Sequence, residues 1–216
     1  MNSSTQNLLI PGNVGQLEIA INLPSGASPV GIALIAHPNP ARGGTMEHKI
    51  VHTLARTFLQ MNYATVRFNY RGVGKSEGEY DEGKGETDDA ATVLNYAQTH
   101  LGLNTLVLAG FSFGSFIQVE LANRLMGHDT YSNIKGLVLV GPAVGSFPIA
   151  NIPENLSSVI IQGQNDEIIS TDEVLLWAYE QKRPVVIFPK CGHFFHGRLL
   201  ELQNELLQRR AVFALQ

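Results

Sequence analysis

The chain has 216 residues, of which 44% are apolar and 16% are charged, and its formal net charge is −4 at pH 7. This composition is ordinary for a globular protein and predicts one domain, residues 1–216, with a full-sized hydrophobic core. The negative charge and a sequence without a run of basic residues argue against nucleic acid or an anionic membrane as the main partner, so a small or neutral ligand is expected.

The N-terminal sequence MNSSTQNLLIPG lacks the basic n-region and the long apolar h-region of a signal peptide. No apolar run in the sequence approaches the ~20 residues that a membrane span needs. Cys191 is the single cysteine, which excludes an internal disulfide and suits a reducing compartment. We therefore expect a cytoplasmic protein without a membrane partner.

Strands alternate with helices along most of the chain. The first residues predict an antiparallel hairpin, because the segment 16–23 alternates apolar and polar residues after a turn at 11–13. The segment 30–36 is apolar throughout, as expected of a strand that helices cover on both faces. The later elements are expected to be a helix at 46–61, a strand at 64–70, a Gly-rich loop at 71–85, a helix at 87–99, a strand at 106–109, a helix at 113–126, strands at 134–140 and 158–162, a helix at 171–181, a strand at 185–188 and a helix at 198–208. This alternation predicts an α/β protein with a doubly wound, mostly parallel sheet and an N-terminal antiparallel hairpin, whose ligands bind beyond the carboxyl ends of the strands.

Ser112 lies in the sequence Gly-Phe-Ser-Phe-Gly, between a predicted strand and a predicted helix. A GxSxG turn in this context is typical of a nucleophile elbow, in which a strained backbone lifts the serine hydroxyl clear of the sheet. The N–H of Phe113 and the positive end of the helix dipole would then face an oxyanion formed beside Ser112. A second GxSxG match, at 74–78, precedes a hydrophilic segment instead of an apolar helix, so Ser76 is interpreted as a loop or cap residue.

Two other strand ends carry residues that would complete a catalytic triad. Asp166 follows the strand at 158–162, and His193 follows the strand at 185–188. A serine hydroxyl needs a base, and an imidazole, which titrates near pH ~6.5, can take the proton and return it. The carboxylate of Asp166 would fix the tautomer of that imidazole and stabilise its protonated form. The order Ser, Asp, His along the chain is the order found in α/β hydrolases.

Both assignments have competitors nearby in the sequence. His196 competes with His193, and we favour His193 because it lies closer to the strand end. Glu167 and Asp172 compete with Asp166. Asp172 fits better as an early helical residue that complements the helix dipole.

A metal site is not expected. Glu47, His48 and His52 resemble part of a metalloprotease helix but do not follow its HExxH order, so they are interpreted as a solvated helix face. The two histidines of the sequence HFFH have no carboxylate or thiolate set at a metal-ligand spacing. Cys191 is interpreted as a packed thiol, because the elbow position belongs to Ser112.

The surroundings of the nucleophile can also be predicted in part. A second oxyanion N–H is expected from the loop after the strand at 30–36. Pro38 has no N–H, which moves the expected donor to Asn39. Phe111, Phe113 and Phe194 are expected to supply an apolar wall for an acyl group.

Together these motifs resemble the α/β-hydrolase superfamily, and within it the small bacterial-type hydrolases related to dienelactone hydrolase. The likeness spans nearly the whole chain and is carried by the segments 37–51 (HPNPARGGTMEHKIV), 67–89, 108–115, 161–168 and 191–199. The resemblance implies a serine hydrolase that acts on esters or related acyl compounds without a cofactor. Dienelactone hydrolase uses cysteine at the elbow and this chain has Ser112, so its substrate is not carried over.

The resemblance also has structural implications. It makes the segment 71–85 a structural loop beside the site, with Arg71 paired to Glu86 or Asp89. A nucleotide-binding P-loop ending at residues 75 and 76 would need glycine at position 69, where this chain has Asn69. Lids of this superfamily commonly follow the strand that is expected here at 134–140, and the short segment 141–157 leaves no room for a large one.

The leading interpretation is a carboxylesterase-like serine hydrolase that passes through an acyl-enzyme at Ser112 and acts on small soluble esters. An amidase, peptidase, thioesterase or acyltransferase would use the same residues. The rival is a non-catalytic protein of the same fold that binds a ligand or partner, because fold does not fix function. The sequence leaves the oligomeric state open, a homodimer included.

Overall fold

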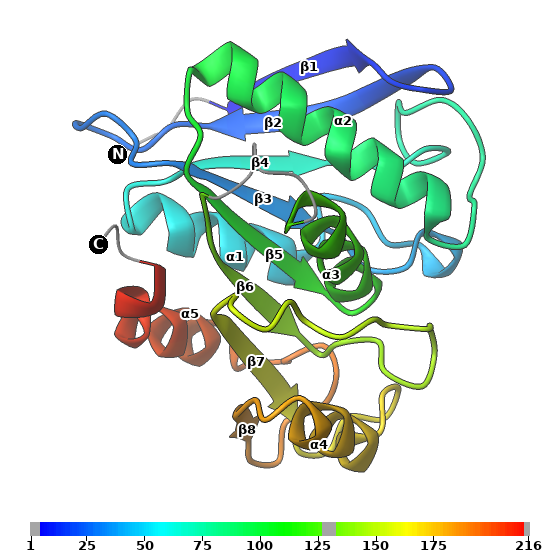
Figure 1. The fold of residues 1–216 in the computed structure, drawn as a ribbon, viewed down its shortest axis with the longest axis vertical. Helices are drawn as coiled ribbons and strands as arrows, with labels where there is room; N and C mark the ends of the chain where they lie inside the picture. The colour runs from blue at the N-terminus through cyan, green and yellow to red at the C-terminus, as the bar shows by residue number, and fades with distance from the viewer. Residues whose placement is uncertain (1–4, 127–132, 214–216) are drawn as a thin grey trace.

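The computed structural model describes residues 5–126 and 133–213. Its centre is an eight-stranded sheet with the strand order β1-β2-β4-β3-β5-β6-β7-β8 (Figure 1). The strands are Thr5–Pro11 (β1), Gln16–Asn22 (β2), Ile32–Ala36 (β3), Ala64–Phe68 (β4), Leu106–Phe111 (β5), Ile134–Val140 (β6), Ser158–Gly163 (β7) and Val185–Phe188 (β8). The helices are Pro40–Arg42 (η1, a 3-10 turn), Lys49–Gln60 (α1), Lys84–Leu101 (α2), Phe113–Met126 (α3), Thr171–Glu180 (α4), Leu199–Gln208 (α5) and Arg210–Phe213 (η3, a 3-10 turn).

The sheet is mixed. β1 and β2 form an antiparallel hairpin, and β2 runs antiparallel to β4. From β4 through β3, β5, β6 and β7 to β8, every neighbouring pair is parallel. The predicted doubly wound, mostly parallel sheet with an N-terminal hairpin is therefore confirmed.

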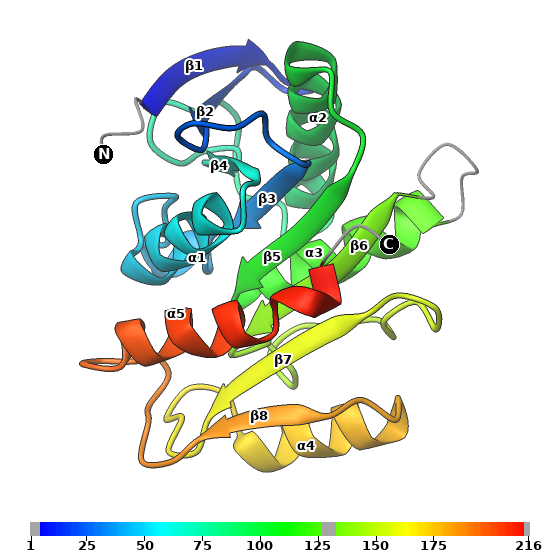
Figure 2. The same cartoon turned by 90° about the vertical axis from the view of Figure 1, so that its left-hand side faces the viewer.

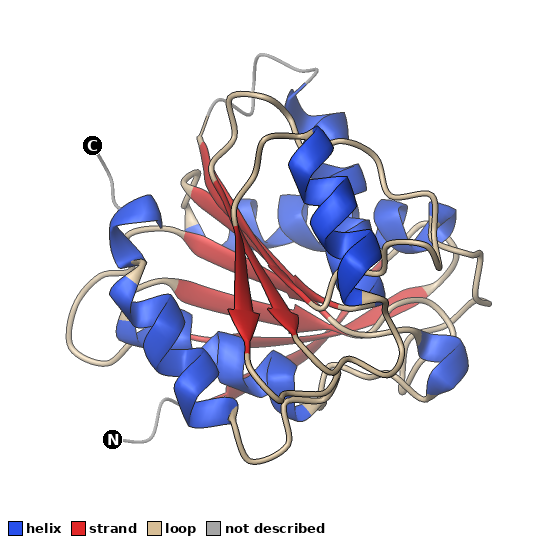
Figure 3. Cartoon of the chain, turned by 90° about the horizontal axis from the view of Figure 1, so that it is seen from below, coloured by secondary structure: helices blue, strands red, loops and turns tan. Residues whose placement is uncertain are grey.

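Helices cover both faces of the sheet. α1 and α5 pack on one face, and α2, α3 and α4 pack on the other (Figures 2 and 3). β3 shows why its sequence does not alternate. Ile32 and Leu34 belong to the core on one face, Ala33 and Ile35 belong to the core on the other, and all four are fully buried. An apolar run is the pattern that a strand covered on both sides requires.

The element boundaries differ from the predicted ones mainly at α2. This helix begins at Lys84, inside the segment expected to be a loop. The carboxylate of Glu86 turns back and accepts hydrogen bonds from the N–H groups of Gly83 and Asp81, at 2.7 and 2.9 Å. These bonds give partners to the N-cap amide, as in a capping box, and to an amide of the preceding loop. The two 3-10 turns were not predicted.

Among residues 5–126 and 133–213, no lid covers the carboxyl ends of the strands. The segment 141–157 between β6 and β7, all of it described, contains no helix or strand. The expectation that this segment leaves no room for a large lid is confirmed. Among the described residues, no helix combines the length and apolar character that crossing a bilayer would take.

Candidate active site

Ser112 occupies the turn between β5 and α3, and its backbone has a φ of +54°. Positive φ is uncommon for a residue with a Cβ and costs about 1–3 kcal/mol. The turn is held by hydrogen bonds from the Ser112 N–H to the Val140 carbonyl, at 2.9 Å, and from the Ser115 N–H to the Ser112 carbonyl, at 2.8 Å. The two flanking glycines are needed for space. A Cβ on Gly110 would collide with the carbonyl of Gly114, and a Cβ on Gly114 would collide with the carbonyl of Ala36.

The structure joins Asp166 and His193, which sequence reasoning had placed at two separate strand ends. Asp166 Oδ2 lies 2.7 Å from His193 Nδ1, and the exposed fractions of the two side chains are 0% and 2%. Asp166 Oδ1 accepts hydrogen bonds from the N–H groups of Ile168 and Ile169, at 2.9 and 2.8 Å. The carboxylate is therefore fixed on one side by backbone and presented to the imidazole on the other.

This arrangement sets the charge and tautomer of the pair. Burial alone would raise the pKa of Asp166, but the hydrogen bonds from His193, Ile169 and Ile168 lower it below its ordinary value. The carboxylate is consequently ionised near neutral pH and can only accept hydrogen bonds. His193 must then carry its proton on Nδ1, which leaves Nε2 as the nitrogen with a free lone pair.

The competing residues lie elsewhere. His196 is exposed, and its Nδ1 accepts a hydrogen bond from Lys49 Nζ at 2.9 Å. Glu167 Oε2 accepts the backbone N–H of His193 at 3.1 Å, so it holds the loop instead of the ring. Asp172 stands in the first turn of α4.

The two expected oxyanion donors have free N–H groups. Phe113 is the first residue of α3, and Asn39 is the N-cap of the 3-10 turn η1. Within residues 5–126 and 133–213, neither N–H donates a hydrogen bond to another backbone group. The side chain of Asn39 is engaged, because its Oδ1 accepts the Ala41 N–H at 2.9 Å.

His37 anchors the start of the loop that carries Asn39. Its Nδ1–H donates to the Pro38 carbonyl at 2.7 Å, and its Nε2 accepts the Tyr70 N–H at 3.3 Å. Burial lowers the pKa of His37 to about 3, and the hydrogen bond to Pro38 only partly opposes this. His37 is therefore a neutral structural residue.

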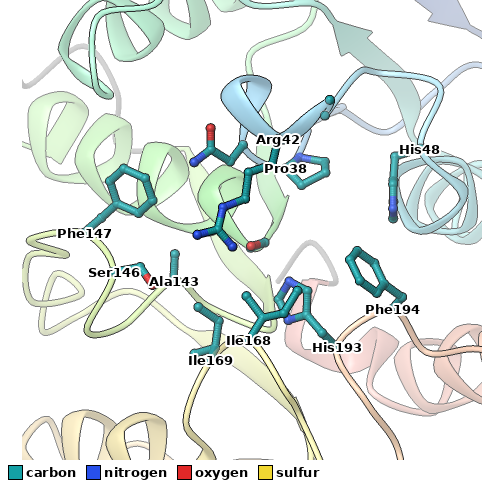
Figure 4. A pocket seen from close by; sticks show the side chains of 14 residues that line it. Pro38, Arg42, His48, Ala143, Ser146, Phe147, Ile168, Ile169, His193 and Phe194 are labelled. Carbon is teal, nitrogen blue, oxygen red and sulfur yellow. The ribbon is translucent and has the colours of Figure 1, made fainter.

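A cavity of about 190 Å³ opens beside these groups (Figure 4). Ser112 and His193 both line it. The remaining lining residues are Pro38, Asn39, Arg42, Gly43, Gly44, His48, Ala143, Ser146, Phe147, Ile168, Ile169 and Phe194. Figure 4 shows His48 and Phe194 on one side of His193, and Phe147 with Ala143 on the other.

Of the three phenylalanines expected to form an apolar wall, only Phe194 lines the cavity. Phe111 and Phe113 are fully buried, on opposite faces of the sheet. Phe111 packs behind His193, with 4.9 Å between the ring centroids, and against His48 at 5.0 Å. The expectation that Phe111 and Phe113 contact substrate is therefore wrong in this structure.

Sequence reasoning missed several lining residues, of which His48 is a clear example. His48 caps the start of α1, where its Nδ1 accepts the Ile50 N–H at 3.3 Å. Burial, with Lys49 and His193 nearby, lowers the pKa of His48 to about 4. The sequence pattern placed His48 inside the predicted helix 46–61, on a solvated face, whereas α1 begins at Lys49 and His48, as its N-cap, lines the cavity.

The other residues singled out in the sequence have structural partners. Ser76 Oγ donates to the Asn69 carbonyl at 2.8 Å, which agrees with a loop residue. Cys191 is buried, and this burial raises the pKa of its thiol. Arg71 pairs with Asp89, whose side chain is 0% exposed, at 2.8 Å.

Of the metalloprotease-like residues, Glu47 precedes α1, His48 is its N-cap and His52 lies on the helix. Glu47 contacts His52 at 2.7 Å and Arg67 at 3.1 Å. In the described part of the chain, no three His, Cys, Asp or Glu side chains are grouped as a metal would require.

Comparison with known proteins agrees with this architecture. The family model described as "alpha/beta hydrolase fold" matches residues 34–158, more than half of the chain. The structure of an alpha-beta serine hydrolase homologue from Coxiella burnetii is 37% identical, with a TM-score of 0.85 over 94% of this chain and 96% of that one. The crystal structure of an a/b serine hydrolase without lid from Xanthomonas campestris is 32% identical, with a TM-score of 0.88 over 100% of this chain and 99% of that one.

An uncharacterized protein of Rickettsia prowazekii is 32% identical over 148 residues, which make up 66% of this chain. The match spans 60% of that relative's length. The family match contains the elbow at Ser112 and ends before Asp166 and His193, whereas the similarity to the Xanthomonas structure extends over the whole chain. The chain belongs to the α/β-hydrolase fold family.

Proposed function

We propose that this protein is a serine hydrolase that cleaves small soluble esters or related acyl compounds through an acyl-enzyme at Ser112. The observation that carries the proposal is the buried hydrogen bond between Asp166 and His193, whose ring lines the same cavity as the strained Ser112. A buried carboxylate–imidazole pair next to a serine in a nucleophile elbow is the arrangement that acyl transfer needs. We also propose, from the sequence segments described above, a relationship to the small lidless hydrolases of the dienelactone hydrolase type.

The proposed roles are those of a catalytic triad. Ser112 Oγ attacks the acyl carbon while His193 Nε2 takes its proton, and Asp166 stabilises the imidazolium. The N–H groups of Phe113 and Asn39 donate to the oxyanion. His193 then gives the proton to the leaving group, and a water, activated by the same nitrogen, releases the acyl group.

The cavity supports a small substrate. Its volume of about 190 Å³ lies below the ~300 Å³ at which drug-sized ligand pockets begin. The segment 141–157, which carries Ala143 and Phe147, leaves the site open instead of covering it. The Xanthomonas relative is likewise described as a serine hydrolase without lid. An open, small site favours soluble esters over a lipid interface.

A fluorophosphonate probe tests this proposal without knowledge of the substrate. Such a probe reacts with a serine only when a base and oxyanion donors are already in place. We expect labelling at Ser112 alone, loss of labelling in Ser112→Ala, and labelling of the matched control Ser76→Ala at the wild-type rate. Ester hydrolysis should fall by about 10⁴-fold or more in Ser112→Ala. If folded wild-type protein fails to react with probes of several sizes, the protein is a non-catalytic member of the family.

The oxyanion donor can be tested with the same probe. Asn39 has a φ of −52°, which proline can adopt, so Asn39→Pro removes the N–H without a conflict at φ. Asn39→Ala is the matched control, because both variants lose the side-chain cap on Ala41. We expect Asn39→Pro to slow labelling by about 10² to 10³ and Asn39→Ala to label normally. Equal losses from the two variants, with circular dichroism showing intact folds, would assign the effect to the side chain.

A further inference from the structure

Arg42 lies at the cavity, and no part of the proposed chemistry uses it. Its guanidinium group extends into the pocket between Phe147 on one side and His193 on the other (Figure 4). In the part of the chain that the structure describes, Arg42 has no ion-pair partner. Most arginines of the molecule are paired with a carboxylate: Arg67, Arg71, Arg124, Arg198 and Arg209.

The charge of Arg42 is not balanced within the cavity. None of the lining residues is a carboxylate. His48 lines the cavity but is neutral near pH 7, because its pKa is lowered to about 4. The negative charge of Asp166 is held behind His193, in a side chain that is 0% exposed. The cavity is otherwise largely apolar, and the exposed Arg42 is the one Lys or Arg among the residues that line it. A second cation, Lys49, lies behind the lining residues His48 and Phe194.

The backbone fixes Arg42 relative to the reacting groups. Arg42 ends the 3-10 turn η1, whose N-cap Asn39 offers the proposed oxyanion N–H. The Arg42 N–H donates to the Asn39 carbonyl at 3.1 Å, and the Gly44 N–H donates to the same oxygen at 3.0 Å. One short turn therefore carries both the donor to the scissile carbonyl and the cation.

We propose that the substrate is an anionic acyl compound, an ester that carries a carboxylate, and that Arg42 binds this carboxylate. This inference rests on the proposed hydrolase function. A guanidinium binds a carboxylate with two parallel N–H···O bonds, which fixes orientation as well as charge. One guanidinium balances one negative charge, which suits a carboxylate better than a phosphate monoester of charge about −1.5 to −2. A half-ester of a short dicarboxylic acid has the required size and charge.

The test compares two 4-nitrophenyl esters of similar length, the half-ester of glutaric acid and the neutral hexanoate. The measured quantity is the ratio of kcat/KM for the anionic ester to kcat/KM for the neutral ester, after subtracting the rate of Ser112→Ala as background. We expect wild-type protein to prefer the anionic ester and Arg42→Gln to lower the ratio by about 10- to 100-fold, the range for a hydrogen bond to a charged group. Arg42→Lys should restore part of the ratio, because it keeps the charge but not the fork. The matched control is Arg56→Gln, an exposed arginine of α1 outside the cavity, which should keep the wild-type ratio.

The outcomes separate this inference from the proposed function. The role of Arg42 would be overturned if the protein is labelled by the probe and hydrolyses the neutral ester, but the anionic-to-neutral ratio of kcat/KM is the same in wild-type protein and Arg42→Gln. That result would leave the hydrolase assignment in place. A wild-type protein that neither labels nor hydrolyses either ester would overturn both. An ionic contact at Arg42 would be supported if the anionic-to-neutral ratio of kcat/KM is lower in Arg42→Gln than in wild-type protein, and if added salt lowers this ratio in wild-type protein.

Discussion

Acidification should destabilise the protein through His37. The ring is fully buried, with a hydrogen bond on each nitrogen, and its pKa is lowered from 6.5 to about 3 because burial disfavours the charged form. In the unfolded chain the ring binds a proton below about pH 6.5. Between these two values the unfolded state binds more protons than the folded state, so the free energy of unfolding falls as the pH falls.

The magnitude follows from the two pKa values. Each pH unit below the unfolded pKa costs about 1.4 kcal/mol until the folded pKa is reached. At about pH 5 the loss from His37 is therefore about 2 kcal/mol, and above about pH 7.5 it vanishes. His48, whose pKa is also lowered, acts in the same direction, so the pH dependence of wild-type protein alone does not isolate His37.

A two-by-two comparison isolates it. Urea unfolding of wild-type protein and His37→Gln should be measured at about pH 7.5 and about pH 5, and wild-type protein should lose about 2 kcal/mol more than the variant on acidification. Equal losses would refute the reasoning. A second readout needs no variant: the ring of His37 should show no NMR titration between about pH 5 and pH 8, and a midpoint near pH 6.5 would contradict a buried neutral imidazole.

Three further predictions concern the site and its support. His193→Ala should abolish esterase activity, as Ser112→Ala should, whereas substitution of the exposed His196 in His196→Ala should keep most of it. Activity that disappears with a chelator would show dependence on a metal and contradict the triad. Asp166→Asn should lower kcat by about 10⁴-fold with little change in melting temperature. The two N–H groups that bind Oδ1 would keep the amide oxygen and turn the NH₂ toward His193, which forces the wrong tautomer. Asp89→Ala should lower the free energy of unfolding in urea by about 3–5 kcal/mol, because it leaves the guanidinium of Arg71 without its partner. Asp88→Ala removes an exposed carboxylate and should cost less than about 1 kcal/mol. Similar losses from the two variants would show that burial does not govern these pairs.

The sheet and the elbow could be predicted from sequence because their signals are local. An apolar run, a GxSxG turn and a helical pattern follow one another within residues 106–126, and the structure places them as β5, the turn and α3. The meeting of Asp166 and His193 could be anticipated for a related reason, since β7 and β8 are parallel neighbours whose carboxyl ends lie at the same edge. What sequence could not settle was the choice between adjacent carboxylates such as Asp166 and Glu167. That choice depends on which side chain the N–H groups of the following loop bind.

The wall of the cavity was harder to predict. Phe111 and Phe113 flank the nucleophile in sequence, yet the backbone reverses between them and sends them into the cores on opposite faces of the sheet. Phe147 and Arg42 line the cavity instead. Phe147 comes from a loop whose sequence has no periodicity, and Arg42 comes from a 3-10 turn. The directions of such side chains depend on long-range packing, which leaves no repeating pattern in the sequence.

The loop after β7 has a consequence for how the proposed specificity could change. Ile168 and Ile169 hold the Asp166 carboxylate with their backbone and line the cavity with their side chains. A substitution there that shifts the backbone alters selectivity and reactivity together, so this wall is constrained during evolution. Phe147 lines the cavity from the separate loop 141–157, and the side-chain partners of Asp166 in the described chain, Gln162, Ile168, Ile169 and His193, all lie outside that loop. New selectivities should therefore arise at Phe147 first, in natural variants as in directed evolution.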